Sequence, residues 1–336
     1  MQKPSLLLGS RLVLIVCFFL FITSCGSGGH SESSAPPSEP LTTWHIRNSQ
    51  IRENLSAVIC GNGLFVAVGE NGTILTSPDG LTWTERSSGT NSNLNGLTYG
   101  NGLFVAVGEN GTILISPDGV AWTENEIADP SGPVSLGQIV YGNSVFVAVG
   151  GPPLSSFLYT SSDGINWKIA SSAQAFLTYY EMTYANGMFL ALTVSYSVHS
   201  GHPPSRSVVT SVDGVTWIPM DESVTSDLPD PITKITYGNG LFVAVGRDGM
   251  IFTSPDMAKW TKRASGIVEW LSDVTYGAGI FVAAGYNGRI LDSPDGKHWT
   301  VRDTQVIGQN LLGVSYGNGT FVAVGTGGII LQSDNL

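Results

Sequence analysis

Four consecutive copies of a sequence repeat replace a small residue with a polar or charged one at the same place. The small residues at this place in other copies are Ala57, Gly96 and Gly313. The residues that replace them are Gln138, Glu181, Lys234 and Asp273. Two carboxyl groups, an ammonium and an amide in one ring of positions have the chemistry either to bind a polar ligand or to pair with one another.

Further polar and aromatic residues belong to the same copies. Tyr179 and Tyr180 directly precede Glu181. A long insertion and the equivalent turns of the next two copies add more candidates, which are Tyr196, His199, His202, Arg206, Arg247 and Arg289. Arginine pairing and aromatic stacking would suit an anionic or sugar-like ligand. The alternative is that Glu181, Lys234 and Asp273 pair internally and that the arginines are solvated turn residues.

Two stretches have ligand types that metals use. His199 and His202 have the spacing of a zinc ligand pair, but no third ligand lies near them in the sequence. The run 221–230 offers carboxylate and hydroxyl oxygens, yet it lacks the regular spacing of a calcium loop, and a solvated acidic loop explains it. We therefore expect neither a metal nor a cofactor.

The elements that position these residues come from a repeat of about 40 residues. The phenylalanine of its FVAVG element recurs seven times, as Phe65, Phe104, Phe146, Phe189, Phe242, Phe281 and Phe321. Each copy reads as four short strands separated by NG and DG turns, and helical periodicity is lacking. The sequence therefore predicts an all-β fold, a seven-bladed β-propeller with four-stranded antiparallel blades.

The two ends of the repeat array predict how the ring closes. The last copy stops at Asp334, after its third strand. The run Thr43–Arg47 matches the fourth strand of the first full copy, Thr82–Arg86. We expect the N-terminal strand to complete the last blade, which makes residues 43–336 one domain without free sheet edges.

Departures from the repeat gather on one predicted face. The sizeable insertions lie in blades three to five, and the longest runs from Val194 to Arg206. All of them fall in loops between the second and third strands or between blades, which meet on the same side of a propeller. Loops on a rigid scaffold often carry function, so this face is the candidate binding surface.

The S-x-D-G-x-x-W turn resembles a shortened Asp-box of the sialidase-like (BNR-repeat) propellers, and the whole repeat resembles propellers grouped with photosystem II assembly factors. The resemblance covers residues 43–336 and implies that the Asp accepts N–H groups of its own turn while the Trp packs beneath the hairpin. These structural residues are Asp79, Trp83, Asp118, Trp122, Asp163, Trp167, Asp213, Trp217, Asp256, Trp260, Asp295 and Trp299. Met257 replaces the turn glycine once, which predicts about 1 kcal/mol of strain or a rearranged turn.

The resemblance also implies an enzyme as one alternative. A sialidase-like site would take its arginines from Arg206, Arg247 and Arg289, its nucleophile pair from Tyr180 and Glu181, and its acid from Asp273. The early F-R-I-P-like arginine motif is absent, and fold resemblance does not transfer chemistry. A lectin-like propeller is the other alternative, but the repeated Trp and Tyr have the pattern of core residues.

The N-terminus predicts export and lipidation. Residues 1–24 read as a lipoprotein signal peptide, with Lys3 and Arg11 before a short apolar run and Ile22-Thr23-Ser24 before Cys25. Cys25 would carry the lipid, and residues 25–42 form a Gly/Ser/Pro-rich tether. Ser27 favours the outer membrane in a cell that has one.

Charge and cysteine content exclude several other classes. The formal net charge is −11, and removal of the two basic leader residues takes it to −13, which argues against nucleic acid as a partner. Cys60 is the only cysteine of the predicted propeller, so no disulfide framework exists. The sequence favours a monomeric, non-catalytic scaffold anchored in the bacterial cell envelope, whose partner is an envelope protein or a glycan.

Overall fold

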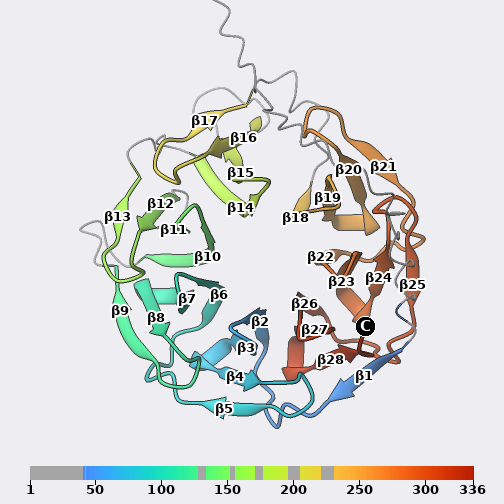
Figure 1. The fold of residues 1–336 in the computed structure, drawn as a ribbon, viewed down its shortest axis with the longest axis horizontal. Coiled ribbons are helices and arrows are strands. Elements are labelled where there is room, and N and C mark those ends of the chain that lie inside the picture. The colour runs from blue at the N-terminus through green and yellow to red at the C-terminus, as the bar shows by residue number, and fades with distance from the viewer. Residues whose placement is uncertain are drawn as a thin grey trace, which may run out of the picture. The chain divides into compact units, whose positions relative to one another are not determined.

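The sequence repeat builds a ring of seven four-stranded antiparallel sheets (Figure 1). The structure is a computed structural model that describes residue 41 and residues 43–127, 134–151, 156–170, 177–195, 205–220 and 231–336. Within these ranges the helices are five short 3-10 turns, and the sheets confirm the predicted seven-bladed, all-β propeller.

Each blade is a meander that runs from the central channel to the outer wall. Blade one consists of β2 (Leu55–Gly61), β3 (Leu64–Gly69), β4 (Ile74–Ser77) and β5 (Thr84–Arg86). Blade two consists of β6 (Leu94–Gly100), β7 (Leu103–Gly108), β8 (Thr112–Ser116) and β9 (Thr123–Glu126). Blade three consists of β10 (Ser135–Gly142), β11 (Val145–Gly151), β12 (Phe157–Ser161) and β13 (Lys168–Ile169). Blades four and five are β14 (Leu177–Ala185), β15 (Met188–Ser195), β16 (Ser205–Ser211), β17 (Ile218–Pro219); and β18 (Ile232–Gly238), β19 (Leu241–Gly246), β20 (Ile251–Ser254), β21 (Thr261–Arg263).

Blades six and seven complete the ring. They are β22 (Leu271–Gly277), β23 (Ile280–Gly285), β24 (Ile290–Ser293), β25 (Thr300–Arg302); and β26 (Leu311–Gly317), β27 (Thr320–Gly325), β28 (Ile330–Ser333), β1 (Trp44–Arg47). The 3-10 turns between second and third strands are η1 (Glu70–Gly72), η2 (Glu109–Gly111), η3 (Arg247–Gly249), η4 (Tyr286–Gly288) and η5 (Thr326–Gly328). The closing strand is the predicted one, because β1 pairs with β28 from Trp44 opposite Ser333 to Arg47 opposite Ile330.

The second strand of each blade forms the core between neighbouring sheets. In β7, Phe104, Val105, Ala106 and Val107 are all buried, because a neighbouring blade covers each face of the strand. The Phe104 ring lies between Tyr99 and Trp122, at centroid distances of 4.6 and 6.5 Å. The same aromatic trio recurs in other blades, which explains why the repeat keeps these residue types.

Adjacent blades meet where a tyrosine ring covers a glycine. A Cβ atom on Gly100 would lie 2.0 Å from Cγ of Tyr141 in the next blade, so only glycine fits there. At the corresponding contact between blades seven and one, Cys60 replaces the tyrosine and lies against Gly317. Burial raises the pKa of the Cys60 thiol, which favours a packing role over a reactive thiolate.

The ring has two distinct faces. We call the side with the first-to-second and third-to-fourth turns the turn face, and the side with the 3-10 turns and the blade-to-blade loops the loop face. Turns of adjacent blades contact each other on the turn face, where Asn318 Nδ2 donates to the carbonyl oxygens of Gly63 and Pro78. Leu41, which the sequence assigns to the tether, is buried beside Trp44 and Ile280, so the propeller begins two residues earlier than Thr43.

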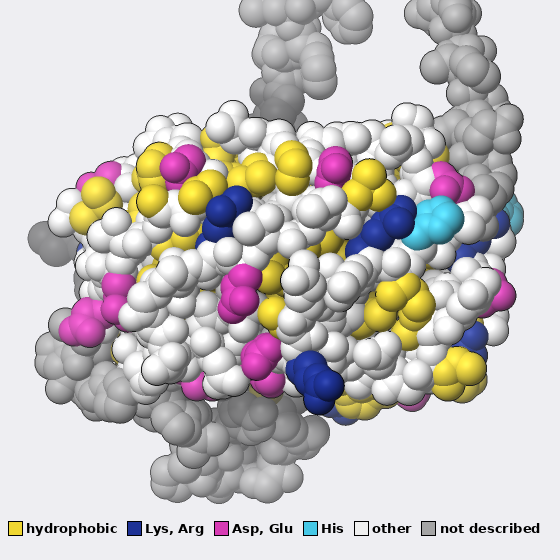
Figure 2. Space-filling view, turned by 90° about the horizontal axis from the view of Figure 1, so that it is seen from below, with side chains coloured by type: hydrophobic (Ala, Val, Ile, Leu, Met, Phe, Trp, Pro, Cys, Tyr) yellow, Lys and Arg dark blue, Asp and Glu magenta, His cyan; other side chains and the backbone are white. Residues whose placement is uncertain are grey.

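Charged side chains lie along the outer wall of the propeller. In Figure 2, hydrophobic side chains lie singly or in small groups among basic and acidic ones. Arg47, Arg86 and Arg263 each donate through Nε to a polar side chain of the neighbouring third strand, and Arg302 pairs with Asp292 in the same way. These contacts fix the short edge strands and discourage pairing with another chain.

Candidate functional site

The S-x-D-G-x-x-W turns use their acidic residues internally. In blade two, Asp118 Oδ1 accepts the N–H groups of Val120 and Ala121 at 2.8 and 3.0 Å, and Trp122 Nε1 donates to the Gly119 carbonyl at 3.0 Å. The N–H groups of Ala121 and Val120 hold the pKa of the Asp118 carboxyl below its usual range. The corresponding bonds are made by Asp79, Asp163, Asp213, Asp256 and Asp295.

The one turn without glycine keeps the same backbone. Met257 has φ of 64°, and Asp256 Oδ1 still accepts the Ala258 N–H at 2.9 Å. The Met257 side chain is buried in the cluster between blades four and five. Trp260 Nε1 is buried without a hydrogen-bond partner among the described residues, so the substitution loosens the turn's bonding without rearranging its path.

The four polar residues of the repeat position come together around the central channel. Gln138 Nε2 donates to Glu181 Oε2 at 2.7 Å, and Lys234 Nζ lies 3.2 Å from Glu181 Oε1. Glu181 is only 1% exposed, whereas Lys234 is 28% exposed. Asp273 accepts N–H groups at both carboxylate oxygens, from Val274 and Val314, each at 2.8 Å.

These side chains clamp neighbouring blades together. The innermost strands of adjacent blades do not share a hydrogen-bonded ladder, so their facing main-chain groups need other partners. Gln138 Oε1 accepts the Met182 N–H of the next blade, and Asp273 Oδ2 accepts the Val314 N–H of the next blade. Asn95 Nδ2 similarly donates to the Leu136 carbonyl. The polar ring therefore closes the inner edge of the propeller.

The charges of the ring are balanced largely within it. Burial raises the pKa of the Glu181 carboxyl, and the Lys234 ammonium and Gln138 offset only part of this rise. Burial also raises the pKa of Asp273, again against the effect of Lys234. For Lys234, burial favours the neutral amine, but the Glu181 and Asp273 carboxylates outweigh it and raise the pKa of the ammonium. Lys234 is therefore the cation that stabilises the buried Glu181 carboxylate and the partly buried Asp273 carboxylate.

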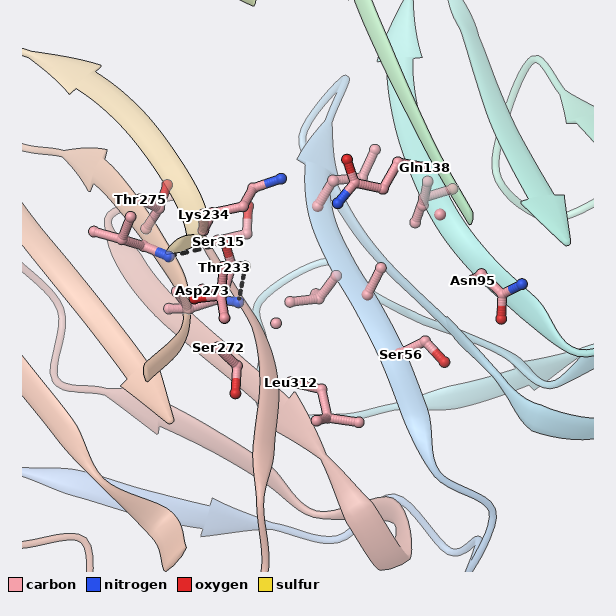
Figure 3. A pocket seen from close by; sticks show the side chains of 18 of the residues that line it. Ser56, Asn95, Gln138, Thr233, Lys234, Ser272, Asp273, Thr275, Leu312 and Ser315 are labelled. Atoms are coloured by element: carbon pink, nitrogen blue, oxygen red, sulfur yellow. Dashed lines mark hydrogen bonds between the residues drawn. The ribbon is translucent and has the colours of Figure 1, made fainter. Parts of the chain in front are cut away.

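The channel itself is a polar cavity of about 300 Å³. Figure 3 shows Lys234, Ser272 and Asp273 on one side of it, with Asn95 and Gln138 on the other. The side chains that carry charge already have protein partners. The geometry therefore fits a structural ring around a small polar channel better than a site for an anionic ligand.

The remaining predicted residues separate from the channel. Tyr179 is buried in the cluster of blades three and four, and Tyr180 packs against the cluster of blades four and five. Arg206 is exposed at the start of β16. Tyr196, His199 and His202 lie outside the described residues, as do Cys25 and the acidic run 221–230.

Arg247 and Arg289 belong to a second cluster, on the loop face of blades five and six. The Arg247 guanidinium lies 4.0 Å from the centroid of the Trp270 ring, and the Tyr286 ring is 5.3 Å from Trp270 on centroids. Arg289 Nη2 is 2.6 Å from Glu269 Oε1. We call Arg247, Glu269, Trp270, Tyr286 and Arg289 the aromatic patch.

Sequence reasoning missed the aromatic centre of this patch. Trp270 is the one tryptophan that falls outside the repeat, which was the available signal. Blades one and seven have an asparagine at the position of Trp270, namely Asn54 and Asn310. In blade one Asn54 Nδ2 donates to Glu70 Oε1 at 2.8 Å, and Glu70 occupies the position that Tyr286 has in blade six. The Asn–Glu pair of blade one is thus replaced in blade six by two large rings, one from the loop before β22 and one from η4.

Among the described residues, no three His, Cys, Asp or Glu side chains gather as a metal would require. No helix in the described part of the chain is long and apolar enough to cross a bilayer.

Comparison with solved structures finds propellers of the same architecture. A structure of YCF48 bound to D1 peptide superposes with a TM-score of 0.68 at 20% identity, covering 88% of this chain and 97% of that one. This chain shares its propeller fold with YCF48. YCF48 from Cyanidioschyzon merolae gives a TM-score of 0.65 at 18% identity, covering 87% of this chain and 98% of that one. The expected likeness to propellers grouped with photosystem II assembly factors is thereby confirmed for the fold.

Other propellers with different roles also match. Streptogramin B lyase, an enzyme by name, has a TM-score of 0.66 at 10% identity over 89% of this chain and all of its own, 100%. The WD40 propeller domain of Doa1 has a TM-score of 0.62 at 13% identity, over 88% of this chain and 96% of that one. No protein-family model and no curated protein matches the sequence. At these identities the comparisons with YCF48 and the others establish the fold alone.

Proposed function

We propose that this chain is a non-catalytic scaffold, held at the bacterial cell envelope by a lipid on Cys25, that binds a protein partner on its loop face. The observation that carries the proposal is the aromatic patch. Trp270 and Tyr286 depart from the repeat, lie in two segments of the loop face and are flanked by arginines. Tryptophan, tyrosine and arginine are the residue types most enriched in the energetic centres of protein interfaces.

Three further observations support a binding role over catalysis. The groups that a sialidase-like site would use already have partners: Glu181 pairs with Lys234, Arg289 with Glu269, and Arg247 stacks on Trp270. Val268, next to the patch, is a large hydrophobic residue left exposed. A YCF48 propeller of the same fold has been solved with a D1 peptide bound, which shows that such a ring is able to hold a peptide.

The test uses a variant that gives the aromatic patch the residues found at the same positions in blade one. Trp270→Asn with Tyr286→Glu rewrites the patch as the Asn–Glu pair of blade one, so the variant should fold normally. Ile46→Asn is the matched control, since Ile46 is an exposed hydrophobic residue on the outer wall. Affinity capture from detergent-solubilised envelope, read by quantitative mass spectrometry, should show a partner with the native chain and the control, and lose it with the double variant.

Three outcomes would contradict the proposal. A partner retained by the double variant would move the interface away from the patch. A glycan array that binds the native chain but not the double variant would assign the same rings to carbohydrate, the alternative that aromatic rings at a surface also suit. Hydrolysis of a fluorogenic sialoside, abolished by Arg247→Ala, would instead revive the enzyme alternative.

A further inference from the structure

The chain enters the propeller on the turn face. Thr43 precedes β1, and its carbonyl accepts the Asp334 N–H, just beyond the end of β28. The C-terminal Leu336 N–H donates to the carbonyl of Gly319, a residue of a turn-face hairpin. The described chain therefore begins β1 from this side of the propeller.

The turn face also carries an arc of exposed aliphatic side chains. Leu81, Val120, Ile165 and Val212, from blades one to four, are between 43% and 66% exposed. Leu81, Val120 and Ile165 each follow the glycine of a turn, where blade six has Lys297. The fold tolerates a charged residue there, so the aliphatic residues are not required by the turn itself. We call these four residues the apolar arc.

The charges near the apolar arc restrict the kind of surface that the arc can contact. Asp79, Asp118, Asp163 and Asp213 lie in the same turns and stay ionised, because N–H groups of their own turns lower their pKa values. An anionic surface would be repelled by this row of carboxylates. A zwitterionic lipid surface would meet aliphatic side chains without net repulsion.

The length of the tether is consistent with a turn face that lies close to the lipid anchor. The segment from Cys25 to residue 40 has 16 residues and a Gly/Ser/Pro-rich composition. A flexible chain of this length has a root-mean-square reach of about 20–24 Å. The seven-residue inner strands alone separate the two faces by about 23 Å. An anchor on this tether therefore lies within easy reach of the turn face, whereas contact of the loop face with lipid would require the tether to stretch around the wall.

We propose that the turn face is the membrane-facing side and that the apolar arc rests on the zwitterionic surface of the bilayer that holds the anchor. This inference rests on the proposed lipid anchor. It leaves the loop face and its aromatic patch directed away from the bilayer, open to a partner.

The experiment measures which face approaches lipid. The mature chain, residues 25–336 with Cys60→Ser, is coupled through Cys25 to a maleimide lipid in phosphatidylcholine vesicles that carry a headgroup quencher. A fluorescent amino acid is placed at Val120 on the turn face or at Val268 on the loop face. We expect quenching at 120 and none above background at 268. Replacing Leu81, Val120 and Ile165 by serine, with the probe moved to Val212, should abolish the quenching, as should anionic phosphatidylglycerol vesicles.

The outcomes separate the two proposals. Equal quenching at 120 and 268, or stronger quenching at 268, overturns the membrane-facing assignment. Quenching that survives the serine replacements overturns the role of the arc. The coupled lipid supplies the anchor in every case, so a native protein whose mass shows no lipid on Cys25 counts against the proposed envelope anchor and not against the orientation.

Discussion

Replacing Lys234 with methionine should destabilise the propeller through Glu181. The Lys234 ammonium is 3.2 Å from a carboxylate that is only 1% exposed, and the other contact of that carboxylate is the neutral amide of Gln138. Methionine keeps the aliphatic stem and removes only the charge. The variant therefore leaves a buried carboxyl group with no cation beside it.

The magnitude follows from that loss. Removing one partner of a buried ion pair costs about 3–5 kcal/mol. For a domain of this size each kcal/mol lowers the melting temperature by about 2–4 °C, so we expect a drop of about 6–20 °C at neutral pH. Adding Glu181→Gln should return the free energy of unfolding to within about 1 kcal/mol of the native chain, because an uncharged pair has no such penalty.

The pH dependence has a definite sign. Burial raises the pKa of Glu181 above its ordinary value of 4.5, and loss of the ammonium raises it further. A group with a raised folded-state pKa contributes stability below its unfolded pKa and loses it as the pH rises through the folded value. The deficit of Lys234→Met relative to the native chain should therefore be largest near neutral pH and shrink toward pH 4.5.

The assay is urea unfolding of the native chain, Lys234→Met and the Glu181→Gln/Lys234→Met pair at several pH values. Two results would refute the reasoning. One is a Lys234→Met chain as stable as the native protein at pH 7. The other is a deficit that does not change between pH 7 and pH 5, which would mean that the lost side chain matters through packing alone.

Three further predictions concern closure and the turns. A chain truncated before Asn48 lacks β1 and exposes the edge of β28, so it should self-associate on size-exclusion chromatography; a monomeric elution would contradict this. Met257→Gly should lower stability in urea despite relieving the left-handed backbone, because losing a buried methionine costs about 2–5 kcal/mol against about 1 kcal/mol of strain. The N–H groups of Thr216 and Val215 lower the pKa of Asp213 to about 2, so its stabilisation is full above its ordinary value of 3.8 and is lost as the pH falls toward 2. Asp213→Asn should remove this part of the acid-unfolding curve, and an unchanged curve would contradict the assignment.

Much of the fold was predictable from the repeat. Seven copies of one four-strand pattern predict which segments pair, because each strand of a copy pairs with the strands next to it in the sequence. The closing of the ring was predictable from the ends, where Thr43–Arg47 supplies the strand that the last copy lacks. The boundary at Leu41 was not, because a lone apolar residue after a proline-rich run gives no sign of the groove that buries it.

The sites were only partly predictable. The sequence by itself determined that Gln138, Glu181, Lys234 and Asp273 share one position in four consecutive blades. Only the tertiary structure decided that Glu181 binds Gln138 and Lys234. It also decided that Gln138 and Asp273 bind main-chain groups of the next blade, because that depends on groups left unpaired at the inner edge of the ring. Tyr196, His199 and His202 stay predictions, since they lie outside the described residues.

For the aromatic patch and the two faces, too, the sequence determined one part and the tertiary structure decided the rest. The sequence determined that Trp270 falls outside the repeat, but the Arg247 and Tyr286 that flank it come from different hairpins, and only blade packing brings them together. The sequence likewise determined that an N-terminal strand closes the ring. The tertiary structure decided from which face the chain leaves, because the direction of β1 is fixed by its antiparallel pairing with β28. Repetition determines local pairing, whereas contacts between copies depend on how the blades pack around the axis.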